Sequence, residues 1–233
     1  MIPIRDDQPR FSTPAITYFL IALNSLIFLF EASLDPRSLQ VLLFRFGLVP
    51  ARVTAALTGS HPMGLAAIIL PMFTSMFLHG SFAHVAGNML FLWIFGDNVE
   101  DYLGHLPYLI FYLVCGLVAM AAQIALTPDL QAPNIGASGA IAGILGAYFV
   151  LYPKARVLVW FPIMFIFQLP AWIMLGFWFV YQFFSGAATS LAATAGTTDS
   201  GIAFWAHVGG FVAGMLLIKV FPERKYRLRY GTW

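Results

Sequence analysis

The sequence has very little charge. Only 9% of its 233 residues are Asp, Glu, Lys or Arg, whereas 60% are hydrophobic, and the mean hydropathy is +0.82. A soluble domain of this length needs far more charge on its surface. Several apolar runs reach the length of about 20 residues that crosses a bilayer as a helix. The composition therefore predicts a polytopic membrane protein.

Cysteine and metal-binding patterns are also scarce. The single cysteine, Cys115, lies in an apolar run and excludes an internal disulfide framework or a cysteine metal cluster. The sequence contains no His-Glu-x-x-His motif, and the acidic residues within 97–101 are predicted at the opposite membrane face from His84. No basic patch with interleaved aromatic residues supports nucleic-acid binding. We therefore expect no metal, no cofactor and no nucleic-acid partner.

The apolar runs predict an all-α membrane protein, a compact bundle of six transmembrane helices in a single domain over residues 1–233. The first run lacks a clear signal-peptide exit and is expected to remain as an anchor. A short N-terminus, 1–13, precedes the spans, and a basic tail, 222–233, follows them. The spans are expected at 14–33, 84–95, 106–126, 138–152, 170–184 and 202–221.

The segments between these spans have distinct compositions. Residues 34–76 are apolar but broken by prolines and glycines, which predicts a long interfacial first loop with short amphipathic helices. Residues 96–101 form a polar exit from the second span, and residues 157–169 are expected at the interface. The fourth span is short, and the small residues of 185–201 predict a loop.

The positions of lysine and arginine predict the orientation. Six spans place both termini on one side of the membrane, and most of the 12 Lys and Arg residues fall on that side. Because such residues concentrate in cytoplasmic segments, we predict that both termini are cytoplasmic. The residues on that side are Arg5, Arg10, Lys154, Arg156, Lys219, Arg224, Lys225, Arg227 and Arg229, and those opposite, all in the long first loop, are Arg37, Arg45 and Arg52.

A serine with very small neighbours begins the fourth span, in Gly136-Ala137-Ser138-Gly139. Small residues are usual where membrane helices pack closely, so this serine could be a packing residue. They would also let a substrate backbone approach a nucleophile. The pattern is not the hydrolase elbow Gly-x-Ser-x-Gly, because Ala140 occupies the last position. The motif alone leaves both interpretations open.

Three polar side chains are predicted at one depth in the membrane. Ser138 lies 15 positions before Pro153, and His207 lies 15 positions before Pro222. At about 1.5 Å per residue, both lie roughly 22 Å from the cytoplasmic edge, and His84 lies roughly 20 Å from it. In a hydrocarbon core of about 30 Å, this depth is roughly 8 Å below the outer face. Separate helices therefore bring one serine and two histidines to the same level.

These groups have the chemistry of a serine hydrolase. A neutral imidazole at His207 can accept the Ser138 proton and return it to a leaving amine. The Ser138 backbone N–H, free at a helix start, can stabilise the oxyanion of the tetrahedral intermediate. His84 and Asn88, four residues apart on one helix face, can add side-chain donors. Loss of one such donor typically costs about a hundred- to a thousand-fold in rate.

A structural interpretation exists for each of these residues. His207 could be a hydrogen-bonded structural histidine, Asn88 could join two helices, and His79 is interpreted as a brace for the long loop. Small residues also recur every fourth position on two spans, which lets their backbones approach closely. These are Gly139, Gly143 and Ala147 on the fourth span, and Ala206, Gly210 and Gly214 on the sixth.

Four short motifs occur in the chain in the following order: His79-Gly80-Ser81-Phe82-Ala83-His84-Val85-Ala86-Gly87-Asn88, Gly96-Asp97-Asn98-Val99-Glu100-Asp101, Gly136-Ala137-Ser138-Gly139 and Ala206-His207-Val208-Gly209-Gly210. This ordered set covers the chain from about Phe73 to Gly214 and resembles the rhomboid family of intramembrane serine proteases. The resemblance implies Ser138 as nucleophile and His207 as base, with His84 and Asn88 in the oxyanion site. It implies no metal and no third, acidic member of a triad.

The resemblance also implies how substrates reach the site. We expect a water-filled cavity that opens outward, and substrates that are single transmembrane helices cut near their outer ends within the lipid bilayer. The fifth span is the candidate lateral gate, beside the second span. By analogy, the chain is expected in a prokaryotic plasma (inner) membrane. The bulky residues of the candidate gate are Phe177, Trp178, Phe179, Phe183 and Phe184.

Two features depart from the family pattern. The Trp-Arg pair that some relatives carry in the long first loop is missing, since Arg45 and Arg52 have no such tryptophan beside them. Some relatives place an aromatic residue four positions after the serine, stacked on the histidine, where this chain has Ala142. The departures concern the loop packing and the orientation of His207.

Two other functions compete with proteolysis. A catalytically inactive rhomboid-like protein would bind membrane helices for quality control or trafficking, but such a protein is expected to lose the serine or the histidine, and both are present. A transporter would usually show paired halves with broken helices and intramembrane acids for ion coupling. We find neither in the sequence. Intramembrane serine proteolysis is therefore the predicted function.

Overall fold

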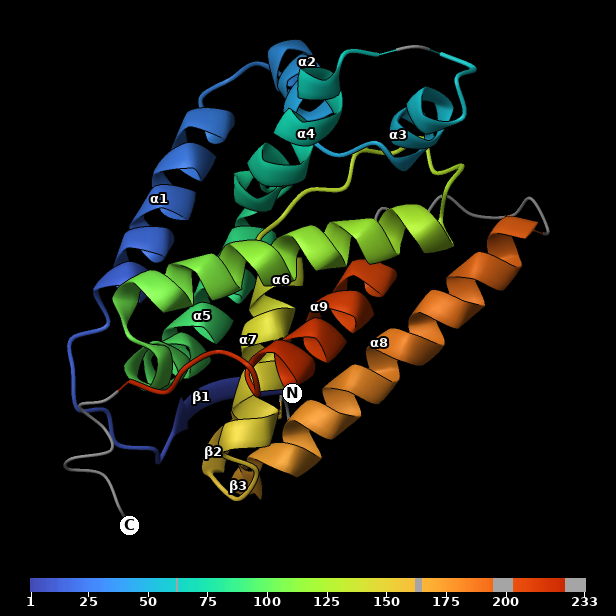
Figure 1. The fold of residues 1–233 in the computed structure, drawn as a ribbon. Helices are drawn as coiled ribbons and strands as arrows, with labels where there is room; N and C mark the ends of the chain where they lie inside the picture. Colours follow the sequence, from blue (N-terminus) through green and yellow to red (C-terminus); the bar gives the residue numbers. More distant parts are fainter. Residues whose placement is uncertain (62, 162–164, 195–202, 225–233) are drawn as a thin grey trace.

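A computed structural model describes residues 1–61, 63–161, 165–194 and 203–224 (Figure 1). Within these ranges, three helices are long and apolar enough to cross a membrane. A fourth span results if α4 and the 3₁₀ helix η1 are counted together with α5, to which they are bent by 81°. The three helices are α1 (Ala15–Ala32), α6 (His105–Leu126) and α8 (Ala171–Thr194). The bent pair comprises α4 (Leu65–Thr74), η1 (Ser75–Phe77) and α5 (Phe82–Leu103).

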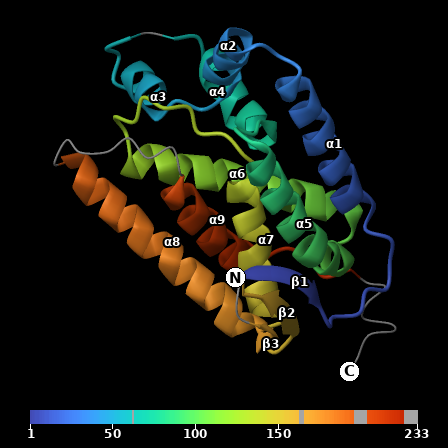
Figure 2. The ribbon, with the colours of Figure 1, turned by 180° about the vertical axis from the view of Figure 1, so that it is seen from behind.

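Two shorter apolar helices form the centre of the bundle. They are α7 (Ser138–Leu151) and α9 (Phe204–Leu217), each of 14 residues. At about 1.5 Å per residue, each is roughly 21 Å long, which is less than the hydrocarbon core. Helices α5, α6 and α8 pack around the pair, with α1 and α8 on opposite sides (Figures 1 and 2). The predicted helical membrane bundle is confirmed, and the count of six spans stays a prediction.

Glycines bring α7 and α9 into backbone contact. A Cβ atom added at Gly214 would collide with the Gly143 carbonyl, and one added at Gly210 would collide with the Gly139 carbonyl. No side chain fits at these positions without moving one helix away from the other. The small-residue stripes predicted on the two spans therefore form the α7–α9 contact, as expected for close helix packing in membranes.

The second span was predicted to end at a polar exit, residues 96–101. This prediction is wrong, because α5 continues through these residues to Leu103. The acidic side chains there accept hydrogen bonds from the start of α1 and from the segment that precedes it. Thr17 donates to Glu100 through its backbone N–H at 2.8 Å and its hydroxyl at 2.7 Å, and the Phe11 N–H donates to Asp101 at 3.1 Å. These bonds satisfy buried carboxylates inside a helix, where the sequence indicated solvent.

Helix α8 extends well beyond the predicted fifth span and reaches Thr194. The first part of the small-residue segment 185–201, predicted as a loop, is therefore helical. Alanine is the best helix former, and Ser185 to Thr194 contains four alanines and one glycine. The rest of that segment, the first residue of the sixth span and the basic tail from 225 onward lie outside the described residues.

A small antiparallel sheet lies at one end of the bundle and was not predicted. Its strands β1 (Ile2–Asp6), β2 (Arg156–Trp160) and β3 (Ile166–Pro170) pair in the order β1-β2-β3. Val157 and Val159 are fully buried, so the central strand covers the end of the core. The strand β1 comes from the segment predicted only as a polar terminus. Its pairing with β2 joins residues about 150 positions apart, which local sequence patterns do not reveal.

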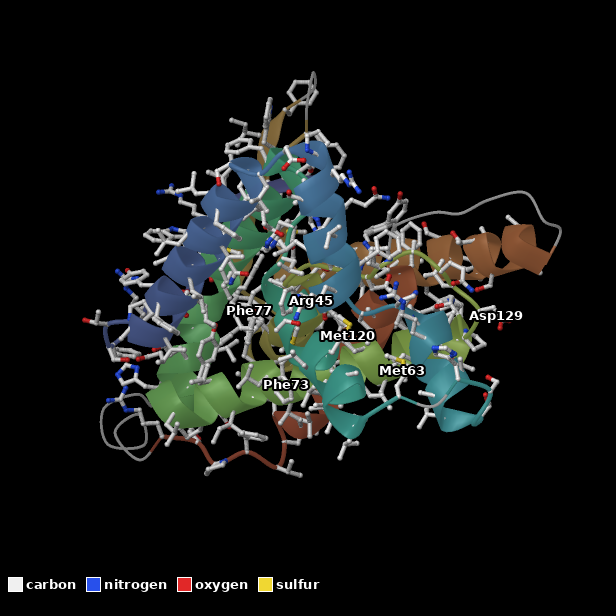
Figure 3. The ribbon with its side chains drawn as sticks, turned by 90° about the horizontal axis from the view of Figure 1, so that it is seen from above. Arg45, Met63, Phe73, Phe77, Met120 and Asp129 are labelled. Atoms are coloured by element: carbon white, nitrogen blue, oxygen red, sulfur yellow. The ribbon has the colours of Figure 1, made fainter. Side chains whose placement is uncertain are left out.

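Short helices cover the opposite end of the bundle. The long first loop forms α2 (Pro36–Phe46), α3 (Pro50–Leu57) and α4, which confirms the prediction of short helices there. Seen from above, α3 and α4 lie over α6, which they contact (Figure 3). Leu48 and Asn134 exchange backbone hydrogen bonds of 3.1 and 2.7 Å. This bridge fastens the loop to the segment that leads into Ser138.

Asp6 in β1 gives a prediction about pH. Its carboxylate accepts a hydrogen bond from the Tyr148 hydroxyl, and burial raises the pKa of Asp6 from 3.8 to about 6. The folded protein therefore keeps this proton to a higher pH than the unfolded chain does. The associated stability is present below about pH 4 and is lost as pH rises through about 6. We expect Asp6→Asn to gain stability relative to wild type over this range.

Thermal unfolding in detergent at about pH 4 and pH 7 measures this difference. The matched control is Asp129→Asn, which removes an exposed carboxylate far from β1 in the chain. The control should shift the unfolding temperature equally at both pH values. A difference between Asp6→Asn and wild type that does not change with pH would contradict the prediction.

Candidate active site

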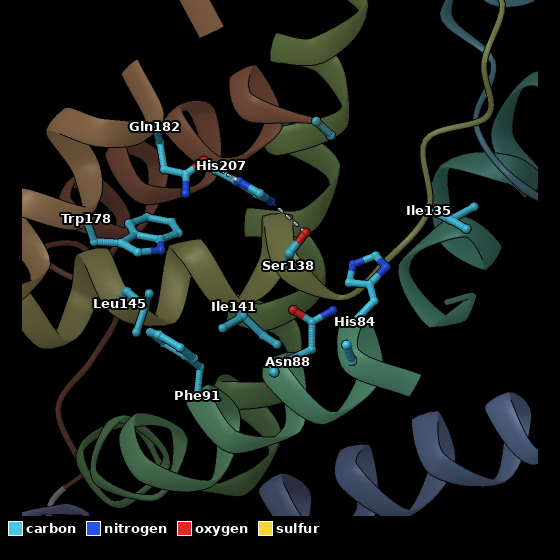
Figure 4. A pocket seen from close by; sticks show the side chains of 13 residues that line it. His84, Asn88, Phe91, Ile135, Ser138, Ile141, Leu145, Trp178, Gln182 and His207 are labelled. Carbon is cyan, nitrogen blue, oxygen red and sulfur yellow. Dashed lines mark hydrogen bonds between the residues drawn. The ribbon is translucent and has the colours of Figure 1, made fainter. Parts of the chain in front are cut away.

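The structure brings the predicted serine and histidine together at the starts of α7 and α9. The Oγ atom of Ser138 lies 2.8 Å from Nε2 of His207, within hydrogen-bonding distance (Figure 4). Both side chains lie in the first turn of their helices. The close glycine contact between the two helices sets this distance, so the predicted meeting of the hydroxyl and the imidazole is confirmed.

Gly136 lets the segment before Ser138 pass directly over His84. Its φ of +121° lies in the region that favours glycine. A Cβ atom added there would lie 2.7 Å from Nε2 of His84, so any other residue would have to displace the His84 ring. The Gly136 N–H donates to the carbonyl of Ser75 at 2.8 Å, which holds the segment in place. His84 therefore lies beside the start of α7, as its predicted depth required.

Asn88 is held by a second histidine. Its Nδ2 atom lies 3.0 Å from Nε2 of His79, and the His79 backbone N–H donates to the Glu31 carboxylate at 3.1 and 3.2 Å. The rings of His79 and His84 meet edge to face, with centroids 5.1 Å apart. His79 thus links α1 to α5 and fixes one N–H of the Asn88 amide. This arrangement is consistent with the structural role predicted for His79.

The four predicted site residues line one cavity of about 370 Å³ between α5, α7, α8 and α9. Figure 4 shows His84 and Asn88 on one side of Ser138 and His207 on the other. An apolar wall with a few convergent polar groups is typical of a ligand site. The lining residues are Ala83, His84, Gly87, Asn88, Phe91, Ile135, Ser138, Ile141, Leu145, Trp178, Gln182, Ala203 and His207.

One residue of the site was missed in the sequence. Gln182 of α8 is 7% exposed, and its Oε1 atom lies 2.8 Å from Nδ1 of His207. A glutamine inside an apolar span is the signal that could have identified it, because buried polar groups in membranes need partners. Trp178, predicted only as part of a gate, also lies beside His207, with ring centroids 5.8 Å apart.

The described part of the chain contains no metal-binding constellation. Among these residues, no group of three or more His, Cys, Asp or Glu side chains could hold a metal ion. Cys115 is a free, buried thiol. The reactive groups in the cavity are therefore a hydroxyl, imidazoles and amides, and the absence of a metal or cofactor from the reaction stays a prediction.

Comparison with known proteins identifies relatives of the chain. A protein-family model described as Rhomboid domain matches residues 68–224. Rhomboid protein 1, mitochondrial, of Saccharomyces cerevisiae is 31% identical over 178 residues, which cover 68% of this chain and 45% of the yeast protein. The human presenilin-associated rhomboid-like protein, mitochondrial, is 33% identical over 99 residues, covering 42% of this chain and 26% of the human protein.

A bacterial relative carries the word protease in its name. Rhomboid protease GluP of Bacillus subtilis is 41% identical over 76 residues, which cover 33% of this chain and 14% of that protein. The chain thus matches less than half the length of these relatives. Their names describe mitochondrial proteins in two cases and a protease in one. The matched family segment contains all four predicted site residues.

Proposed function

The chain belongs to the rhomboid family, and on that premise we propose that it is an intramembrane serine endopeptidase. Its substrates are single-span transmembrane proteins, cut near their outer ends within the lipid bilayer. The observation that carries the proposal is the 2.8 Å contact between the Ser138 hydroxyl and the His207 imidazole, facing an apolar cavity. The GluP relative, which is named a protease, supports the same reaction class.

The proposed reaction uses Ser138 as nucleophile and His207 as general base. Nε2 of His207 takes the hydroxyl proton while Oγ attacks the carbonyl carbon of the scissile peptide. The tetrahedral intermediate collapses when the imidazolium gives that proton to the leaving amine, which breaks the C–N bond. Water then attacks the acyl-enzyme, again losing a proton to Nε2, and the products are a free carboxylate and the restored serine.

The oxyanion of the intermediate needs hydrogen-bond donors. The Ser138 N–H lies in the first turn of α7, where backbone N–H groups have no intrahelical partner and the helix dipole favours negative charge. We assign the other donors to the His84 ring and the second N–H of Asn88. Because His79 already binds one N–H of that amide, the Asn88 side chain has a fixed direction.

The proposal includes a topology. The chain is a single rhomboid-type domain over residues 1–233, with six spans and both termini on the cytoplasmic side, and α8 is the lateral gate beside α5. The exposed aromatic residues Phe177, Phe183 and Phe184 suit a lipid-facing helix. The expected location in a prokaryotic plasma membrane came from analogy, and the mitochondrial names of several relatives do not support it. We therefore propose a cellular membrane without assigning the compartment.

An activity-based probe tests the proposal directly. The detergent-solubilised chain should react with a fluorophosphonate at Ser138, identified by mass spectrometry of the labelled peptide, and should cleave a test protein with one transmembrane helix. Ser138→Ala should abolish both signals. The matched control is Ser185→Ala on α8, which removes a hydroxyl outside the cavity lining. Labelling elsewhere, or a bound helix that is never cut, would favour the inactive relative.

A further inference from the structure

The ring of His207 makes contacts on both nitrogens. Nε2 faces Ser138 at 2.8 Å, and Nδ1 faces Oε1 of Gln182 at 2.8 Å. A neutral imidazole has one N–H donor and one nitrogen that accepts. An amide oxygen at Nδ1 can only accept, so the proton lies on Nδ1 and the lone pair of Nε2 points to the serine hydroxyl. This tautomer is the one that a general base at Nε2 requires.

The indole of Trp178 lies beside the same ring. The two ring centroids are 5.8 Å apart and the rings are inclined by 38°. Trp178 and Gln182 are four residues apart on α8, so they project from the same face of that helix. In Figure 4 both side chains come from α8 and lie on the far side of His207 from Ser138. One face of α8 thus places two side chains against the imidazole, Gln182 at Nδ1 and Trp178 beside the ring.

Helix α7 has no space for an aromatic side chain beside His207. Four residues after the serine, Ala142 is fully buried, and a Cβ added at Gly210 would lie 3.3 Å from the Ala142 Cβ. An aromatic side chain at 142 would push α9 away from α7. The packing of α7 against α9 thus accounts for the alanine at the position where some relatives have an aromatic residue. The contacts that fix the His207 ring come from α8.

We propose that Gln182 is a positioning residue that holds His207 in the tautomer and orientation needed to deprotonate Ser138, with Trp178 supporting the ring from the same helix. The inference rests on the proposed function. It adds to the site a residue, Gln182, that does not itself take part in the reaction. Because both contacts belong to α8, a shift of α8 away from α9 releases the base. The position of this helix and the readiness of the dyad are therefore coupled.

Three variants separate positioning from packing. Gln182→Met keeps the length of the side chain but removes the acceptor, whereas Gln182→Glu keeps an acceptor at Nδ1. The matched control is Tyr181→Met, at the neighbouring α8 position, whose side chain is 64% exposed. We expect Gln182→Met to lower kcat roughly ten- to a hundred-fold, the loss typical when the hydrogen-bond partner of a metal-binding histidine is removed, with KM little changed. Gln182→Glu should recover most of kcat, and Tyr181→Met should match wild type.

The tautomer itself is measured by ¹⁵N NMR of histidine-labelled protein in detergent, with the His207 signals assigned from their loss in His207→Ala. Wild type and Gln182→Glu should carry a proton on Nδ1, and Gln182→Met should lose that preference. An unchanged tautomer in Gln182→Met, or a loss of kcat that Gln182→Glu does not recover, overturns the proposal. If wild type cuts nothing but its tautomer depends on Gln182, the positioning contact holds and the proposed protease function fails.

Discussion

Replacement of His207 by alanine is expected to abolish cleavage almost as completely as replacement of Ser138. The two side chains act as one unit, because the hydroxyl is a poor nucleophile until the imidazole takes its proton. Each single variant should therefore lose about 10⁴- to 10⁶-fold in kcat, and the double variant should be no worse than the poorer single one. The small residual rate would come from binding and from the oxyanion donors.

Single-turnover cleavage of the transmembrane test substrate measures these rates. The matched control is His61→Ala, which removes an exposed histidine of the first loop. Thermal unfolding should show that all variants remain folded. Effects that multiply in the double variant would mean that the two residues act independently. If His207→Ala keeps more than about a tenth of wild-type kcat, His207 is not the general base.

The glycine contact between α7 and α9 gives the second large effect. In Gly214→Val, the new side chain would overlap the Gly143 carbonyl, and a backbone atom cannot rotate away as a side chain can. The helices must separate, which also parts Ser138 from His207. We expect a loss of more than about 4 kcal/mol in the free energy of unfolding, an exceptional value for one substitution. Cleavage and probe labelling should disappear with it.

The same substitution at Gly176 is the matched control. This glycine lies on α8, and no atom lies within 4 Å of a Cβ added there. Gly176→Val should change stability by less than about 1 kcal/mol, since valine is a slightly better helix former than glycine. Thermal unfolding in detergent compares the two variants. Similar unfolding temperatures for Gly214→Val and wild type would show that α7 and α9 do not depend on their backbone contact.

Much of the membrane architecture follows from the sequence because a bilayer allows few solutions. Apolar runs bounded by polar residues located α1 and α6 to within one or two residues. The constant rise of a helix placed Ser138 and His207 at one depth, and the four-residue spacing of glycines indicated close packing. Each of these inferences uses a local, one-dimensional regularity. The family resemblance assigned roles to the same residues, and those roles stay proposals.

Other features were decided by contacts between distant parts of the chain. The helical path of α5 through Glu100 depends on hydrogen bonds from Thr17, and the strand β1 exists because it pairs with β2. Gln182 reaches His207 only because α8 lies beside α9. The sequence by itself determined which residues could react and that Ser138 and His207 share one level, since that level depends on position along a helix. Only the tertiary structure decided what surrounds the imidazole, because side chains from different helices meet according to packing rather than to their order in the chain.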